Sequence, residues 1–130
     1  MNSKLKHILI IDDDKTFAFI TFKILKKIAS SARIELKMSG QTGLQYLEIC
    51  DKNMDFPHLI TLDLNMPLGD GEFFLKHYQS NYKNKYPGTK IVVISDMAEK
   101  DIKAKTASYP FVVDYLKKPI DEEKLAKFLS

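Results

Sequence analysis

The chain has 130 residues, which is enough for one domain with a sizeable core, and its 45% hydrophobic content argues against disorder. Twenty basic and seventeen acidic residues give a net charge of +3, too balanced to indicate a nucleic-acid or membrane surface. The single cysteine, Cys50, excludes an internal disulfide, and together with a first apolar run of four residues it favours a cytoplasmic protein without a signal peptide or membrane span.

Predicted strands and helices alternate along the whole chain. Buried or alternating apolar runs predict strands at 7–12, 33–38, 58–63, 90–95 and 111–116. Helical patterns lie at 15–30, after Gly40, from about Gly71, at 97–108 and at 121–129. This alternation predicts one domain, residues 1–130, with a doubly wound parallel α/β sheet and helices on both faces.

Two of the predicted helices have faces that bear on function. In the helix over 15–30, Phe17, Ile20, Ile24 and Ile28 share a face and are expected in the core. Phe19 falls on the opposite side among lysines, where it is either a docking contact or a single exposed apolar residue. The segment 97–108 is lysine-rich with few apolar anchors, which predicts low local stability and a capacity to move.

Polar residues lie at or just past the ends of four of the predicted strands, and parallel strands bring their carboxyl ends to one edge. These residues are Asp12, Asp13, Asp63, Ser95 and Lys118. In the flavodoxin-like order 2-1-3-4-5 the first and third strands are neighbours, so the three aspartates crowd together at the topological switch point. Two carboxylates ~5 Å apart repel by roughly 3 kcal/mol at an effective dielectric of 20, and a divalent cation with oxygen ligands, Mg²⁺ or Mn²⁺, cancels this repulsion.

This set of residue types fits phosphoryl transfer. Asp63 is the candidate nucleophile, Asp12 and Asp13 the metal ligands, Lys118 the cation and Ser95 the hydrogen-bond donor. The alternative is that each residue caps a helix or solvates the end of a strand.

The sequence resembles the receiver domain of two-component response regulators along essentially its whole length. The matching motifs are ILIIDDD, LDLNMPLGDG, IVVIS and YLKKP. The resemblance implies that Asp63 accepts a phosphoryl group from a histidine kinase or a histidine phosphotransfer protein. It also implies a regulatory phosphoacceptor rather than an enzyme, acting on a downstream protein target without contacting nucleic acid directly, and a stand-alone receiver.

The resemblance further implies a role for each site residue. Mg²⁺ would bind Asp13, Asp63 and the backbone carbonyl of Asn65, with Asp12 acting through water. Lys118 would pair with the phosphoryl group, next to a cis Lys118–Pro119 bond. Ser95 would move toward the phosphoryl oxygen, and Tyr115 would turn inward behind it.

Two positions depart from the family pattern. Asp96 follows the switch hydroxyl, where a small residue is usual. Its carboxylate either repels the phosphoryl group, which predicts slowed or weakened phosphorylation or a more closely gated site, or caps the following helix and points away. Gly69 replaces a bulkier apolar residue, which predicts a more flexible loop.

Two rival interpretations stay open at this point. Asp12-Asp13-Asp14-Lys15-Thr16 also matches the DxDxT motif of haloacid-dehalogenase-type phosphatases, with Asp12 as nucleophile, Asp14 as general acid, Ser95 as the second motif and Lys117 or Lys118 as the third. This interpretation leaves Asp63 and its loop unexplained and lacks a later acidic pair. The second rival is a receiver-like module that binds partners without phosphorylation, although such modules typically lose part of the pocket that this chain keeps.

Overall fold

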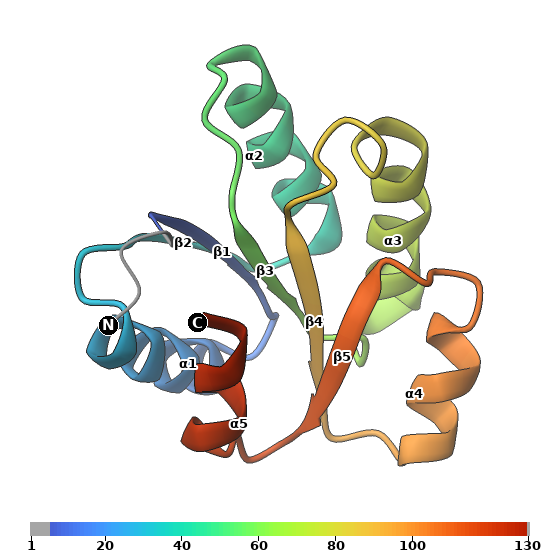
Figure 1. Cartoon of the computed structure of the whole chain (residues 1–130). Coiled ribbons are helices and arrows are strands. Elements are labelled where there is room, and N and C mark those ends of the chain that lie inside the picture. Colours follow the sequence, from blue (N-terminus) through green and yellow to red (C-terminus); the bar gives the residue numbers. More distant parts are fainter. Residues whose placement is uncertain (1–5, 130) are drawn as a thin grey trace.

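Five parallel strands form one sheet in the order β2-β1-β3-β4-β5, as predicted (Figure 1). The computed structural model describes residues 6–129. In chain order the elements are β1 His7–Ile11, α1 Lys15–Ile28, β2 Arg33–Lys37, α2 Gly40–Lys52, β3 Leu59–Leu62, η1 Pro67–Gly69, α3 Asp70–Asn81, β4 Lys90–Ser95, α4 Glu99–Thr106, β5 Val112–Lys117, α5 Glu122–Ala126 and η2 Lys127–Leu129.

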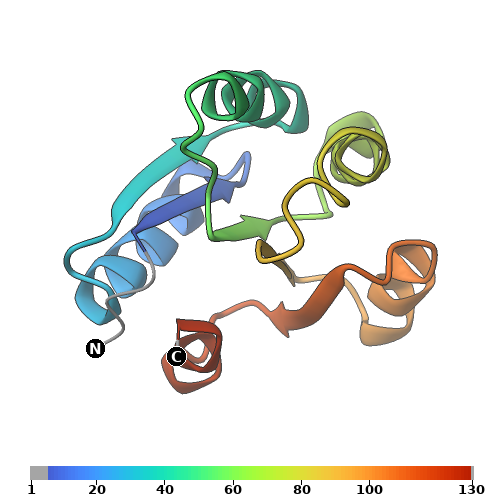
Figure 2. The same ribbon diagram turned by 45° about the horizontal axis from the view of Figure 1, so that its top comes forward.

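Helices cover both faces of the sheet and create two cores. Every residue of β1 is buried, and its side chains alternate between the two: Leu9 and Ile11 enter one core, Ile8 and Ile10 the other. The first core lies under α2, α3 and α4, and the second under α1 and α5 (Figures 1 and 2). Coverage on both faces explains why the central strands read as continuous apolar runs.

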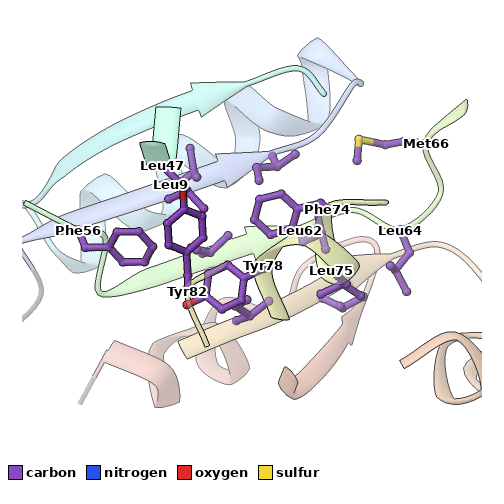
Figure 3. Packing of buried hydrophobic residues seen from close by; sticks show 14 of the residues in the cluster. Leu9, Leu47, Phe56, Leu62, Leu64, Met66, Phe74, Leu75, Tyr78 and Tyr82 are labelled. Carbon is purple, nitrogen blue, oxygen red and sulfur yellow. The ribbon is translucent and has the colours of Figure 1, made fainter. Parts of the chain in front are cut away.

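The core beneath α3 is rich in aromatic side chains. Phe74 and Tyr78 of α3 and Tyr82, the C-cap residue after it, recur every fourth residue and face the sheet together with Phe56 from the α2–β3 connection (Figure 3). The Phe56 ring stacks on Tyr86 with 3.8 Å between the ring centroids. This packing fixes α3 and, through it, the loop that leads from β3 into the helix.

The buried face of α1 differs from the predicted one. Ala18, Thr21 and Leu25 are its buried residues, whereas Ile20 is 45% exposed, so its assignment to the core was wrong. Phe17, Ile24 and Ile28 are partly buried against the second core, as predicted. Phe19 is 56% exposed and lies near Phe22 and Lys23, which agrees with its predicted outward position.

Two helices at the C-terminal end of the fold are shorter than predicted. α4 covers Glu99–Thr106 instead of 97–108, and Ile102 is its buried residue. The predicted helix over 121–129 splits into α5, capped by the Asp121 carboxylate, and the 3₁₀ turn η2. Within residues 6–129, none of the helices has the length and apolar character needed to cross a membrane.

Candidate functional site

The ends of β1 and β3 bring three carboxylates together. The backbone N–H of Asp12 donates to the Lys37 carbonyl and that of Asp63 to the Ile11 carbonyl, each at 3.0 Å, so the parallel ladder continues to both aspartates. Asp12 and Asp63 are buried, and Asp13 beside them is exposed. One oxygen from each of the three carboxylates lies within 4.8 Å of the others. The predicted juxtaposition of the three aspartates is thus present.

Lys118 joins this cluster from the end of β5. Its Nζ lies 3.2 Å from Asp12 Oδ2 and 3.2 Å from Asp63 Oδ2. Its backbone N–H donates to the Ser95 carbonyl at 3.0 Å, and the Lys118–Pro119 bond is cis, as expected. The ammonium also lies 4.1 Å from the centre of the Phe17 ring, an attractive cation–π arrangement. The lysine is therefore held between the two buried carboxylates.

The charges in the pocket are unequal. Burial raises the pKa of Asp12 to about 6; the Asp14 N–H opposes this shift and the Asp63 carboxylate adds to it. Burial alone would lower the pKa of Lys118, but Asp63 and Asp12 outweigh it and hold that pKa above its ordinary value. In the part of the chain that the structure describes, the cluster of three carboxylates is paired with one ammonium, that of Lys118. Oxygen ligands with excess negative charge and one exposed member, Asp13, fit a hydrated divalent cation such as Mg²⁺.

Ser95 and Tyr115 lie on the neighbouring strands β4 and β5. Ser95 is completely buried, and its Oγ accepts a hydrogen bond from the Met97 N–H at 3.1 Å. The Tyr115 hydroxyl donates to the Glu99 carboxylate on α4, and this hydrogen bond is the main cause that raises the Tyr115 pKa to about 12. Tyr115 is thus linked to α4, while its predicted inward turn stays a prediction.

Asn65 and Asp96 connect two loops at this edge of the sheet. The Asn65 N–H donates to Asp63 Oδ1 and its side-chain Nδ2 donates to Asp96 Oδ1, both at 2.9 Å. The N-cap residue of α4 is Ala98, so the suggestion that Asp96 caps this helix was wrong. Sequence reasoning missed the Asn65–Asp96 pair, although both residues sit one or two positions beyond site residues on adjacent strands.

The remaining site predictions concern the flanking loops. Asp14, the general acid of the phosphatase interpretation, is the N-cap of α1, where its carboxylate accepts from the Phe17 N–H at 3.1 Å. Leu68 and Gly69 both adopt left-handed φ angles, 61° and 67°. Leu68 is fully exposed in this conformation. The greater flexibility predicted at Gly69 stays a prediction.

A model of the response regulator receiver domain family matches residues 8–130. Among solved structures, a two-component response regulator from Cytophaga hutchinsonii superposes with a TM-score of 0.85 at 21% identity, covering 95% of this chain and 93% of that one. A two-component response regulator from Legionella pneumophila superposes with a TM-score of 0.76 at 25% identity, covering 95% of this chain and 94% of that one. The phosphorylated cyanobacterial phytochrome response regulator RcpA superposes with a TM-score of 0.75 at 24% identity, covering 96% of this chain and 89% of that one. Comparison with curated proteins gives no match.

Proposed function

Because this chain belongs to the response regulator receiver domain family, we propose that it is a signalling phosphoacceptor in which Asp63 takes a phosphoryl group from a phosphohistidine donor. The observation that carries the proposal is the Lys118 ammonium, held 3.2 Å from both Asp12 and Asp63 within the three-carboxylate cluster. The proposed domain comprises residues 1–130, and the proposed donor is a histidine kinase or a histidine phosphotransfer protein.

The proposed reaction forms an aspartyl phosphate. A carboxylate oxygen of Asp63 forms a bond to phosphorus as the N–P bond of the phosphohistidine breaks. The electron pair of that bond stays on the imidazole nitrogen, which then takes up a proton. The Asn65 N–H and the Lys118 ammonium contact opposite oxygens of the Asp63 carboxylate, which fixes the orientation of the nucleophile.

The residues that would hold Mg²⁺ or Mn²⁺ are Asp13, Asp63 and the backbone carbonyl of Asn65, with Asp12 acting through water. When bound, the ion neutralises charge on the phosphoryl oxygens. Lys118 would stabilise another of these oxygens, and its raised pKa keeps it charged for that role. Among residues 6–129 the Ser95 hydroxyl accepts from the Met97 N–H and makes no donor hydrogen bond, which leaves its proton free to donate.

Phosphorylation would reach a protein target through α4 and β5. Movement of Ser95 toward the phosphoryl group would shift the loop after β4, and Tyr115 would leave Glu99 and turn inward. α4 is suited to such a shift because it is short and buries Ile102 alone among its residues. Phe19 on α1 is the proposed contact for the phosphodonor.

The test is incubation with Mg²⁺ and acetyl phosphate, followed by intact-mass measurement of the wild type and Asp63→Asn. We expect one added phosphoryl group in the wild type and none in the variant. A phosphatase of the haloacid-dehalogenase type would still be labelled in Asp63→Asn, through Asp12. A non-phosphorylated interaction module would show no added mass, and neither Mg²⁺ nor the donor would change its thermal stability.

A further inference from the structure

We propose that Asn65 and Asp96 form a gate over the phosphoryl pocket, and that the hydrogen bond between their side chains, rather than the charge of Asp96, slows access to Asp63. This proposal rests on the proposed function, because it concerns the rate at which the same site is phosphorylated.

The positions of the two residues place their bond across the site. Asn65 lies two residues beyond Asp63 on the β3–α3 loop, and Asp96 lies one residue beyond Ser95 on the β4–α4 loop. Both gate residues are exposed, whereas Asp63 and Ser95 are buried. The 2.9 Å bond from Asn65 Nδ2 to Asp96 Oδ1 therefore ties the two loops together on the solvent side of the buried pair.

Hydrogen bonds also fix the backbone around Asp96. The Lys117 ammonium on β5 donates to the Asp96 carbonyl at 3.2 Å and to the Met97 carbonyl. The Met97 N–H donates to Ser95 Oγ at 3.1 Å. Because these bonds fix the backbone on both sides of Asp96, its carboxylate is presented to Asn65 in a set position, with little further ordering needed to close the gate.

Closing the gate has two consequences for the site. A small phosphodonor or an attacking water that enters between the two loops meets this bond, so in the proposed gate the closed bond slows phosphorylation and hydrolysis of the aspartyl phosphate together. The gate thus sets a threshold for entering the phosphorylated state.

Three substitutions separate the hydrogen bond from the charge. Asp96→Ala removes both. Asn65→Ala removes the bond but keeps the Asp96 charge and the backbone carbonyl at position 65. Asp96→Asn removes the charge and keeps an amide oxygen that can accept from Asn65 Nδ2. Asp101→Ala, which removes an exposed carboxylate from α4, is the control for loss of a nearby negative charge.

The measurement is the rate of phosphoryl incorporation from acetyl phosphate with Mg²⁺, and the decay rate after donor removal, by intact mass. We expect Asp96→Ala and Asn65→Ala each to raise both rates roughly three- to tenfold, which corresponds to the loss of one exposed hydrogen bond. The double variant should have the same rates as either single variant, because both substitutions remove the same bond. Both rates of Asp96→Asn and of Asp101→Ala should stay within about twofold of the wild-type rates.

Several outcomes overturn the gate. If Asp96→Asn is as fast as Asp96→Ala, the charge is responsible. If the two alanine effects multiply in the double variant, the residues act independently. If all variants are phosphorylated at the wild-type rate, no gate exists, although the proposed function stands. Absence of phosphorylation in every protein, including the wild type, instead rejects the proposed function and the gate with it.

Discussion

Lys118 places a positive charge between two buried carboxylates, so its removal tests the electrostatics of the site at a single residue. We expect Lys118→Met to lower the free energy of unfolding by about 3 kcal/mol in the absence of metal, because Asp12 and Asp63 then lie buried without a counter-charge. Mg²⁺ should restore part of the loss and bind the variant more tightly than the wild type, because the ammonium no longer opposes it.

Urea unfolding with EDTA and with Mg²⁺ measures both effects. Lys124→Met, on the exposed surface of α5, is the matched control and should change the unfolding free energy by less than about 0.5 kcal/mol. Equal losses in the two variants, or a Lys118→Met protein indifferent to Mg²⁺, would contradict the placement of the ammonium between the carboxylates.

Gly71 sits where the backbone after β3 folds back on itself. A Cβ at this position would lie 2.9 Å from Leu64 Cα and 3.0 Å from the Asp63 carbonyl oxygen, and these backbone atoms cannot yield easily. We expect Gly71→Ala to destabilise the protein by about 2 kcal/mol and to weaken Mg²⁺ binding by displacing the loop that carries Asp63. A Cβ at Gly88 meets no described atom within 4 Å, so Gly88→Ala should be nearly neutral in the same denaturation experiment. Similar effects of the two substitutions would refute the packing argument.

At the residue scale, the sequence was informative about strand ends and uninformative about side-chain partners. Asp12, Asp63 and Lys118 could be brought together from topology alone, because parallel strands share a carboxyl edge. The hydrogen bond between Asn65 and Asp96 depends on loop conformation, which no periodicity encodes. This is why Asp96 was open to two interpretations, a repulsive charge or a helix cap, neither of which included Asn65.

At the scale of elements, α1 shows where hydrophobic periodicity becomes ambiguous. Apolar side chains occur on almost every side of this helix: Phe17, Phe19, Ile20, Phe22, Ile24, Leu25 and Ile28. A wheel therefore admits more than one core face. The structure selects the face with small residues, Ala18 and Thr21, because they let the helix approach the sheet closely around Leu25.

This selection makes a prediction about two residues of similar volume in the same helix. Leu25→Ala should lower the free energy of unfolding by about 3 kcal/mol, because Leu25 is fully buried and its truncation leaves a cavity. Ile20→Ala should lower the free energy of unfolding by less than about 1 kcal/mol, because the Ile20 side chain is 45% exposed. Thermal or urea denaturation of the two variants measures the difference. A larger loss for Ile20→Ala than for Leu25→Ala would favour the buried face predicted from the sequence.

At the scale of the whole molecule, the alternation of strand and helix patterns was sufficient for the architecture. Doubly buried strands at β1, β3 and β4 require helices on both faces, and right-handed crossovers leave few orders for five parallel strands. The ends of α4 and α5 were less predictable, because short helices with few apolar anchors depend on capping and tertiary contacts rather than on periodicity.

The opposite edge of the sheet holds a buried histidine that joins several elements. His7 at the start of β1 hydrogen-bonds through Nε2 to the Tyr46 hydroxyl on α2, and its Nδ1 lies 3.4 Å from Asp55 Oδ1 on the α2–β3 connection. Arg33 on β2 pairs with the same carboxylate. Burial, aided by Arg33, lowers the pKa of His7 below its ordinary value of 6.5, and the attraction of Asp55 only partly opposes this shift.

The lowered pKa of His7 predicts a loss of stability in mild acid. As the pH falls through 6.5 the unfolded chain binds a proton at this residue before the folded protein does, so the free energy of unfolding decreases until the folded pKa is passed. Asp12, with its pKa raised to about 6, acts in the opposite direction over an overlapping range, so the wild-type curve alone is not diagnostic.

His7→Gln keeps a polar side chain and leaves Asp12 unchanged. Urea unfolding between about pH 7.5 and 5.5 should therefore show a larger loss of stability for the wild type than for His7→Gln, with an excess slope of at most about 1.4 kcal/mol per pH unit, the limit for one proton. Parallel curves for the two proteins would mean that His7 binds its proton equally well in the folded and unfolded chain.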